Sequence, residues 1–199
     1  MAMRVPVGKV LIVAVCACIL SGGAGDSRAQ EKDRAMPHPT AGAPAGDGMK
    51  MLEAGAVAPE FSIKDTAGTT FNLSEQRGRK PVLLVFWSMF CEKCRFEMPI
   101  VQKIHARYKD AGLEVVAVTV DGEPLKKSIV GFAKQEGYTF KVLIDELDSR
   151  ESFKAADPFG VSGTPTLYLI DRTGKIVLAR AGHVREEDLE KAVQAVLKR

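Results

Sequence analysis

Cysteine and histidine are scarce in this chain of 199 residues, which contains four cysteines and three histidines. Two of the cysteines lie within the first 29 residues, so only Cys91 and Cys94 remain in the rest of the sequence. Because a disulfide framework needs several cysteine pairs, the class of small, disulfide-stabilised proteins is excluded. A structural zinc site needs four ligands, and the segment after residue 54 adds only His105 and His183 to the two cysteines. We expect both histidines to lie at the surface, with His183 solvated, and predict neither a metal ion nor another cofactor.

A strong net charge and a long hydrophobic run are missing too. The 28 basic and 25 acidic residues give a formal net charge of +3, and the basic excess lies largely in the first 29 residues. Such a balanced charge lacks the basic excess typical of nucleic-acid-binding domains, so we expect no nucleic-acid partner. The longest apolar run, residues 10–20, would form a helix of roughly 16 Å, whereas a spanning helix must cross roughly 30 Å of hydrocarbon.

Residues 1–29 have the order of an export signal. The basic residues Arg4 and Lys9 precede the apolar run, and small residues ending at Ala29 offer a cleavage point. We therefore predict an exported, periplasmic protein. Two alternatives stay open, an uncleaved anchor and a lipidated N-terminus, the latter because the sequence around Cys18 faintly resembles a lipoprotein attachment site.

After this signal the composition changes twice. Residues 30–54 are rich in Ala, Gly and Pro without an apolar period, which predicts a flexible linker, and residues 55–199 form the folded domain. In the domain, apolar segments alternate with amphipathic ones, predicting strands over 61–64, 69–73, 82–87, 113–120, 140–144, 167–170 and 176–181, and helices over 94–110, 125–136, 149–155 and 186–197. This order favours an α/β fold with a central mixed sheet, helices on both faces and an N-terminal β-hairpin.

Cys91 and Cys94 stand at the junction of a buried strand and a helix. Three residue steps span roughly 10 Å in an extended chain but about 5 Å on a helical turn, and only the latter allows a disulfide. At a helix start, free backbone N–H groups and the helix dipole lower the pKa of the first thiol. We therefore expect Cys91 to attack a substrate disulfide and Cys94 to resolve the mixed disulfide.

Two stretches resemble the thioredoxin superfamily. The first is FWSMFCEKC, in which Trp87 stands four residues before the first cysteine, and the second is VSGTPT over residues 161–166. The resemblance implies a thioredoxin-like fold in which Pro165 forms a cis peptide bond beside the cysteines. It further implies that Thr164 and Pro165 bind the substrate. We group Trp87 with these substrate-binding residues and expect it to pack beneath the active site rather than to act as a catalyst.

The stretch CEKCRFEMP is similar to the exported TlpA/ResA-type thiol–disulfide oxidoreductases, and the similarity extends over residues 54–199. It implies that Glu97 assists proton transfer at the thiols, and that a segment is inserted before the cis-proline loop. Proteins of this group mostly reduce protein disulfides, such as those of apocytochrome c or of oxidase assembly factors, and a membrane thiol carrier reduces them again. This chain departs from the superfamily at Lys93, where proline is frequent, and at Val85, where thioredoxin has a buried aspartate.

Two other functions are weighed against this one. A peroxiredoxin carries P-x-x-x-[ST]-x-x-C, and Ser88 fits this motif for Cys91, but Leu84 stands where the proline belongs. A copper-binding assembly chaperone would use the soft thiolates, flanked here by Met89 and Met98. The chain lacks the C-x-x-x-C spacing of the copper-delivering relatives, so thiol–disulfide exchange remains the favoured function.

Overall fold

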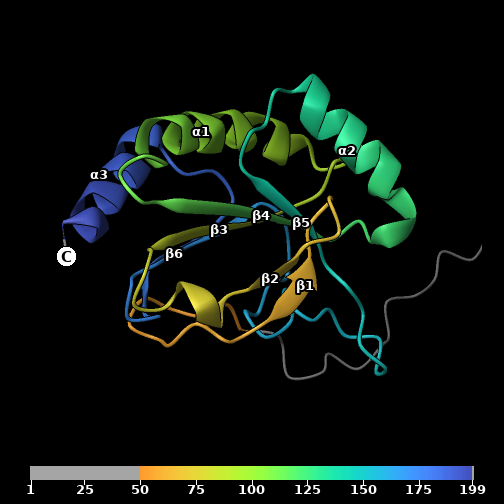
Figure 1. Ribbon diagram of the computed structural model, residues 1–199, viewed down its shortest axis with the longest axis horizontal. Coiled ribbons are helices and arrows are strands. Elements are labelled where there is room, and N and C mark those ends of the chain that lie inside the picture. The colour runs from red at the N-terminus through yellow and green to blue at the C-terminus, as the bar shows by residue number, and fades with distance from the viewer. Residues whose placement is uncertain (1–49, 199) are drawn as a thin grey trace, which may run out of the picture. The chain divides into compact units, whose positions relative to one another are not determined.

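A five-stranded mixed sheet forms the centre of the computed structural model, which describes residues 50–198 (Figure 1). The strand order is β5-β4-β3-β6-β7, with bounds β3 Val82–Trp87, β4 Glu114–Thr119, β5 Lys141–Ile144, β6 Thr166–Ile170 and β7 Ile176–Ala181. Strand β3 pairs parallel with β4 and antiparallel with β6, and β4 pairs parallel with β5. Strands β6 and β7 form the expected antiparallel hairpin. The predicted mixed sheet is therefore confirmed.

Three α-helices, α1 Glu92–Tyr108, α2 Lys126–Gln135 and α3 Glu186–Leu197, all lie on one face of this sheet (Figure 1). The expectation of helices on both faces is thus corrected for the α-helices of residues 50–198. The steps from β3 to β4 and from β4 to β5 run the same way across the sheet. Right-handed crossovers taken in one direction place their helices on the same face.

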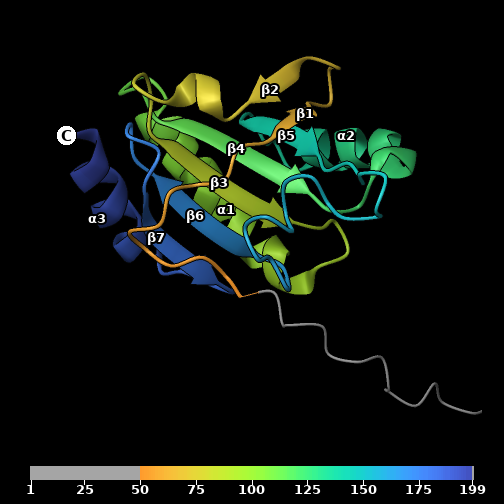
Figure 2. The ribbon, with the colours of Figure 1, turned by 90° about the horizontal axis from the view of Figure 1, so that it is seen from below.

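The opposite face is covered by a hairpin and by irregular chain. The predicted hairpin is confirmed as β1 Ser62–Lys64 paired antiparallel with β2 Thr70–Asn72. Figure 2 shows the hairpin beside β5, to which a backbone bridge between Asp65 and Leu143 joins it. Between β5 and β6, buried side chains such as Ala155 and Phe159 complete the core on this face.

The helix predicted over residues 149–155 is wrong, because this segment consists of turns. Asp145 explains the difference: its buried carboxylate accepts hydrogen bonds from the backbone N–H groups of Glu146, Ala155 and Ala156 at 2.8–3.0 Å. These bonds fold the segment back on the end of β5. A side chain here replaces the bonds that a helix would have supplied.

Strand β3 is buried on both faces, as its unbroken apolar run predicts. Leu83, Val85 and Trp87 point into the core beneath the helices, whereas the alternate residues point into the core beneath the hairpin. The strand is thus held from both sides, and it fixes the start of the loop that leads to Cys91.

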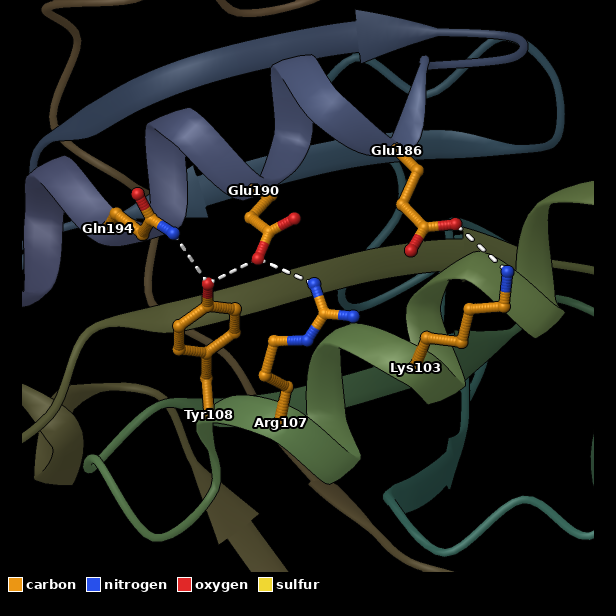
Figure 3. Close-up of polar contacts among 6 residues, drawn as sticks. All are labelled: Lys103, Arg107, Tyr108, Glu186, Glu190 and Gln194. Atoms are coloured by element: carbon orange, nitrogen blue, oxygen red, sulfur yellow. Dashed lines mark hydrogen bonds and ion pairs between the residues drawn. The ribbon is translucent and has the colours of Figure 1, made fainter.

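Helices α1 and α3 are joined by six polar side chains (Figure 3). Glu190 of α3 accepts hydrogen bonds from two residues of α1, and the contacts are Lys103–Glu186 2.9 Å, Arg107–Glu190 2.5 Å, Tyr108–Glu190 2.6 Å and Gln194–Tyr108 2.8 Å. A single exposed ion pair contributes little to stability, but a shared network holds its members in register. The network around Glu190 therefore holds α3 against α1, and the separate pair Lys103–Glu186 lies at the start of α3.

The predicted export signal, residues 1–29, and the first part of the predicted linker lie outside the described residues. The last linker residues contact the domain: the N–H of Leu52 donates a hydrogen bond to the carbonyl of Phe159 at 3.3 Å. Within residues 50–198, no helix is long and apolar enough to cross a membrane.

Gly160 provides a test of how the last linker residues pack against the domain. Its φ is +69°, and a Cβ added there would clash with the backbone carbonyl of Lys50. We expect Gly160→Ala to lower the free energy of unfolding by about 2 kcal/mol, since the left-handed conformation alone costs roughly 1–2 kcal/mol. Thermal unfolding should show a melting temperature lower by roughly 4–8 °C. Gly131→Ala, in the exposed part of α2 with open space at the Cβ, is the control and should be neutral or stabilising. An unchanged melting temperature for Gly160→Ala would contradict the packing.

Candidate active site

Cys91 is the N-cap residue of α1, directly after the loop that leaves β3. Its backbone is extended, and its sulfur accepts a hydrogen bond from the backbone N–H of Cys94 at 3.1 Å. Both cysteines are free thiols, so the structure represents the dithiol form. The strand, the loop and the helix start therefore bring the two cysteines together as the sequence predicts.

The environment of Cys91 favours its thiolate. Burial by itself raises the pKa of this thiol, but hydrogen bonds with Cys94 and Thr164, and from the backbone N–H groups of Cys94 and Lys93, lower the pKa below its ordinary value. The thiol also lies 3.3 Å from the carbonyl oxygen of Thr164, to which it can donate a hydrogen bond. Cys91 is partly exposed, and so combines accessibility with nucleophilic character.

Cys94 has the opposite character. Its side chain is buried, and burial together with the neighbouring Cys91 sulfur raises the pKa of Cys94 to about 12. At neutral pH this thiol stays protonated, so a proton must be removed before it can attack a disulfide.

The Thr164–Pro165 peptide bond is cis, as the resemblance implies. This bond lies just before β6, the strand next to β3, and places the carbonyl of Thr164 against the Cys91 sulfur. The carbonyl of Pro165 accepts a hydrogen bond from the N–H of Gly182, just after β7, at 2.8 Å. The loop is therefore held from the neighbouring strand and forms the wall opposite the cysteines.

Glu97 lies one helical turn after Cys94 on the buried face of α1. Its side chain is fully buried, and its Oε2 accepts hydrogen bonds from the Val184 N–H at 3.2 Å and lies 2.8 Å from Nδ1 of His183. Burial raises the pKa of the Glu97 carboxyl, and the bonds to His183 and Val184 only partly offset this effect. His183 is exposed to solvent as predicted, but the sequence did not predict that one side of its ring is bound to Glu97.

Asp121 is a site residue that the sequence argument missed. Its carboxylate accepts hydrogen bonds from the Ser88 hydroxyl at 2.6 Å, the Met89 N–H at 2.8 Å and the Thr119 hydroxyl at 2.7 Å. Asp121 thereby fixes the loop before Cys91. The sequence offered one signal for Asp121, its position shortly after β4. Because β3 and β4 are parallel neighbours, they end at the same edge of the sheet, where the Cys91 loop also begins.

Trp87 lies beneath the site and is completely buried. Its ring stacks on Phe132 of α2 with centroids 5.9 Å apart and contacts the edge of Tyr138. Trp87 therefore supports the substrate-facing surface from below, as expected for a packing residue. The exposed rings of Phe90 and Phe96 flank the cysteines at the surface itself.

Comparisons with known sequences agree with this geometry. The chain matches the AhpC/TSA family over residues 54–179. It is similar to the thiol–disulfide oxidoreductase ResA of Geobacillus kaustophilus, with 36% identity over 142 residues that cover 71% of this chain and 77% of that protein. ResA of Bacillus anthracis is 33% identical over 139 residues, which cover 70% and 76% of the two chains.

Similar solved structures support the same assignment. A protein from Chlorobium tepidum, described as a candidate thiol:disulfide interchange protein DsbE, superposes with a TM-score of 0.63 and 33% identity, covering 73% of this chain and 99% of that one. The thioredoxin domain of a thiol–disulfide oxidoreductase from Bacteroides vulgatus gives 0.62 and 27%, with the coverage 73% and 99%. The same assignment follows from three observations: the dithiol at the start of α1, the cis-proline loop beside it, and the similarity to these relatives. The chain belongs to the AhpC/TSA family of thioredoxin-fold proteins and is a ResA-like thiol–disulfide oxidoreductase.

Proposed function

We propose that this protein is exported to the periplasm and there reduces disulfides of other proteins. The observation that carries the proposal is the contrast between the thiols, since the pKa of Cys91 is lowered and that of Cys94 is raised to about 12. A partly exposed thiol whose pKa is lowered and a buried resolving thiol suit stepwise exchange. The predicted signal of residues 1–29 and the resemblance to exported oxidoreductases support the location.

The reaction starts at Cys91. Its thiolate attacks one sulfur of the substrate disulfide, so that a Cys91–substrate disulfide forms and the second substrate sulfur leaves as a thiolate that takes up a proton. The wall formed by Thr164 and Pro165 lies beside Cys91 and would bind the substrate backbone next to its disulfide.

Cys94 completes the reaction. It transfers its proton to the carboxylate of Glu97, one turn further along α1, and attacks the Cys91 sulfur. The Cys91–Cys94 disulfide forms, and the reduced substrate leaves with the two electrons. Oxygen Oε1 of Glu97 is buried without a hydrogen-bond partner among the described residues, which leaves it available for this proton.

A donor of electrons must then restore the dithiol. Following the resemblance to the TlpA/ResA-type proteins, we assign this step to a membrane thiol carrier. By the same reasoning we assign apocytochrome c or oxidase assembly factors as substrates, which places the protein in cytochrome c biogenesis.

Disulfide exchange is favoured over peroxide reduction, although the AhpC/TSA match and the β1–β2 hairpin would suit either activity. Leu84, which stands at the proline position of the peroxiredoxin motif, is buried inside β3. Ser88, the residue that fits the motif, is engaged with Asp121. The similar proteins of Geobacillus and Bacillus carry the name of thiol–disulfide oxidoreductases.

Trapping of substrates tests this function. In a Cys94→Ala protein the resolving thiol is missing, so mixed disulfides through Cys91 should accumulate in the periplasm. They can be isolated under non-reducing conditions and identified by mass spectrometry after reduction. The Cys91→Ala protein is the control and should trap nothing. Absence of adducts from the Cys94→Ala protein would contradict a role in thiol exchange.

Alkylation of the reduced protein tests the difference between the thiols. Iodoacetamide should modify Cys91 alone at pH 7, and the rate should rise with pH through a pKa below about 8.5, the ordinary value for a free thiol. Since the pKa of Cys94 is raised to about 12, this residue should remain unmodified until the protein unfolds. Mass spectrometry of peptides gives both rates. Equal modification of the two cysteines at pH 7 would disprove the assignment.

The redox potential tests the direction of electron flow. Equilibration with glutathione should give a value near that of thioredoxin, about −270 mV, whereas a value near about −120 mV would identify an oxidase. Lys93→Pro removes a backbone N–H that lowers the pKa of Cys91, and should make the potential more negative because the thiolate of the reduced form is less stabilised. Lys93→Ala keeps this N–H and is the matched control. If both variants shift the potential equally, the lysine side chain and not the backbone is responsible.

A further inference from the structure

The Glu97 carboxyl has no direct access to water. Its side chain is fully buried, one oxygen is bound by His183 and Val184, and the other has no partner within residues 50–198. In the proposed reaction this carboxyl accepts a proton from Cys94 and must release it before the next cycle. A sealed carboxyl can do so only through a neighbouring group that itself exchanges protons.

His183 is such a group, because its ring connects the buried carboxyl with solvent. Its Nδ1 lies 2.8 Å from Oε2 of Glu97, whereas 59% of the side chain is exposed. Within the described part of the chain, the ring makes no other hydrogen bond. Imidazole can take up a proton on one nitrogen and release one from the other, and it does so near neutral pH.

The backbone around His183 holds the ring in this position. The preceding residue, Gly182, donates a hydrogen bond to the carbonyl of Pro165, and the following residue, Val184, donates one to Glu97. Val184 is itself buried in the core beneath the helices. Just beyond it, the pair Lys103–Glu186 joins the start of α3 to α1, the helix that carries Glu97, and the contacts of Glu190 join the two helices further along (Figure 3). Both partners of the contact are therefore fixed by the fold.

His183 is the main electrostatic partner of Glu97, because the charged side chains of the surrounding elements are paired with other residues or exposed to water. Among residues 50–198 it is the ionisable side chain that acts on the carboxyl electrostatically, lowering its pKa against the effect of burial. At the start of α3, Glu186 pairs with Lys103 and Asp188 with Arg185, while Glu187 is exposed to water. On β7, Arg180 is exposed to water, and on α1 the Cys94 thiol is neutral at pH 7.

We propose that His183 is a positioning and proton-relay residue that connects the buried Glu97 with solvent while Cys94 resolves the mixed disulfide. The inference rests on the proposed roles of Cys91, Cys94 and Glu97. The proton leaves the Cys94 thiol for Oε1 of the Glu97 carboxylate, and rotation of the carboxyl group then brings it to His183. It passes to the unprotonated Nδ1 of the imidazole, which releases a proton from Nε2 to water. No electrons move in this relay, since the electron pair of Cys94 forms the bond to Cys91. When the protein is reduced again, the proton returns to Cys94 by the same path.

The His183→Asn protein separates the relay from the hydrogen bond. The amide nitrogen of asparagine occupies the place of Nδ1 and can donate to Glu97, but an amide does not relay a proton at neutral pH. Resolution of the mixed disulfide should slow by about a hundredfold, the lower end of the range for acid–base groups. Its pH profile should shift to higher pH, because Glu97 loses an imidazole whose protonated form lowers the pKa of the carboxyl. His105→Asn, an imidazole of α1 outside the site, is the matched control and should change neither quantity.

The measurement uses the full-length protein and its single tryptophan. Trp87 lies beneath the cysteines, so its fluorescence in stopped-flow mixing with a labelled peptide disulfide should report closure of the Cys91–Cys94 disulfide. The rate of Cys91 alkylation should stay within about twofold of the wild type in both variants, because the first thiol does not depend on the relay. Thermal unfolding confirms that each variant is folded.

Chemical rescue completes the test. The His183→Ala protein should resolve the mixed disulfide slowly, and added imidazole should restore most of the rate. An unchanged rate and pH profile in His183→Asn would overturn the relay, and so would a slow His183→Ala protein that imidazole does not restore. If the wild-type protein itself reacts at Cys91 but never reduces the peptide disulfide, the proposed function fails instead of the relay.

Discussion

The hydrogen bond from the Cys94 backbone N–H to the Cys91 sulfur is the contact on which the chemistry of the site depends. It exists because α1 begins at Cys91, and α1 begins there because the buried strand β3 ends four residues earlier. The Cys91 sulfur caps the start of α1, and the Cys94 sulfur is buried on the inner side of this helix. A single backbone geometry thus lowers one pKa and raises the other, although the two residues are chemically identical.

Partners of the two thiols come from segments far apart in the sequence. Thr164 reaches Cys91 because β6 lies next to β3, and His183 reaches Glu97 because β7 lies next to β6. The order of the strands therefore brings the Cys91 loop, the Thr164 loop and the His183 segment together in one site. Placing all three α-helices on one face has the same effect, since the contact of α3 with α1 holds the His183 segment against Glu97 (Figure 3).

The elements with a strong apolar period could be predicted from the sequence: β3 was predicted residue for residue, and α3 likewise. The segment 149–155 could not, because a single buried carboxylate, Asp145, competes there with helical bonding. Cys91, Cys94 and the cis bond at Pro165 were accessible through local motifs. The position of Asp121 after β4 indicates the edge of the sheet but not its partner 32 residues away, and nothing near His183 in sequence reveals a partner 86 residues away.

The balance of effects on Cys91 also bears on the direction of electron flow. A thiolate that is strongly stabilised favours the dithiol and makes a protein an oxidant. Here burial opposes the hydrogen bonds that lower the pKa of Cys91, and the dithiol also keeps Cys94 as a thiol with a pKa of about 12. Lys93 adds a backbone N–H that a proline would lack, which favours the thiolate, but its exposed side chain does not cover the sulfur. Burial therefore opposes the stabilisation of the Cys91 thiolate, which is the direction that the proposed role as a reductant requires.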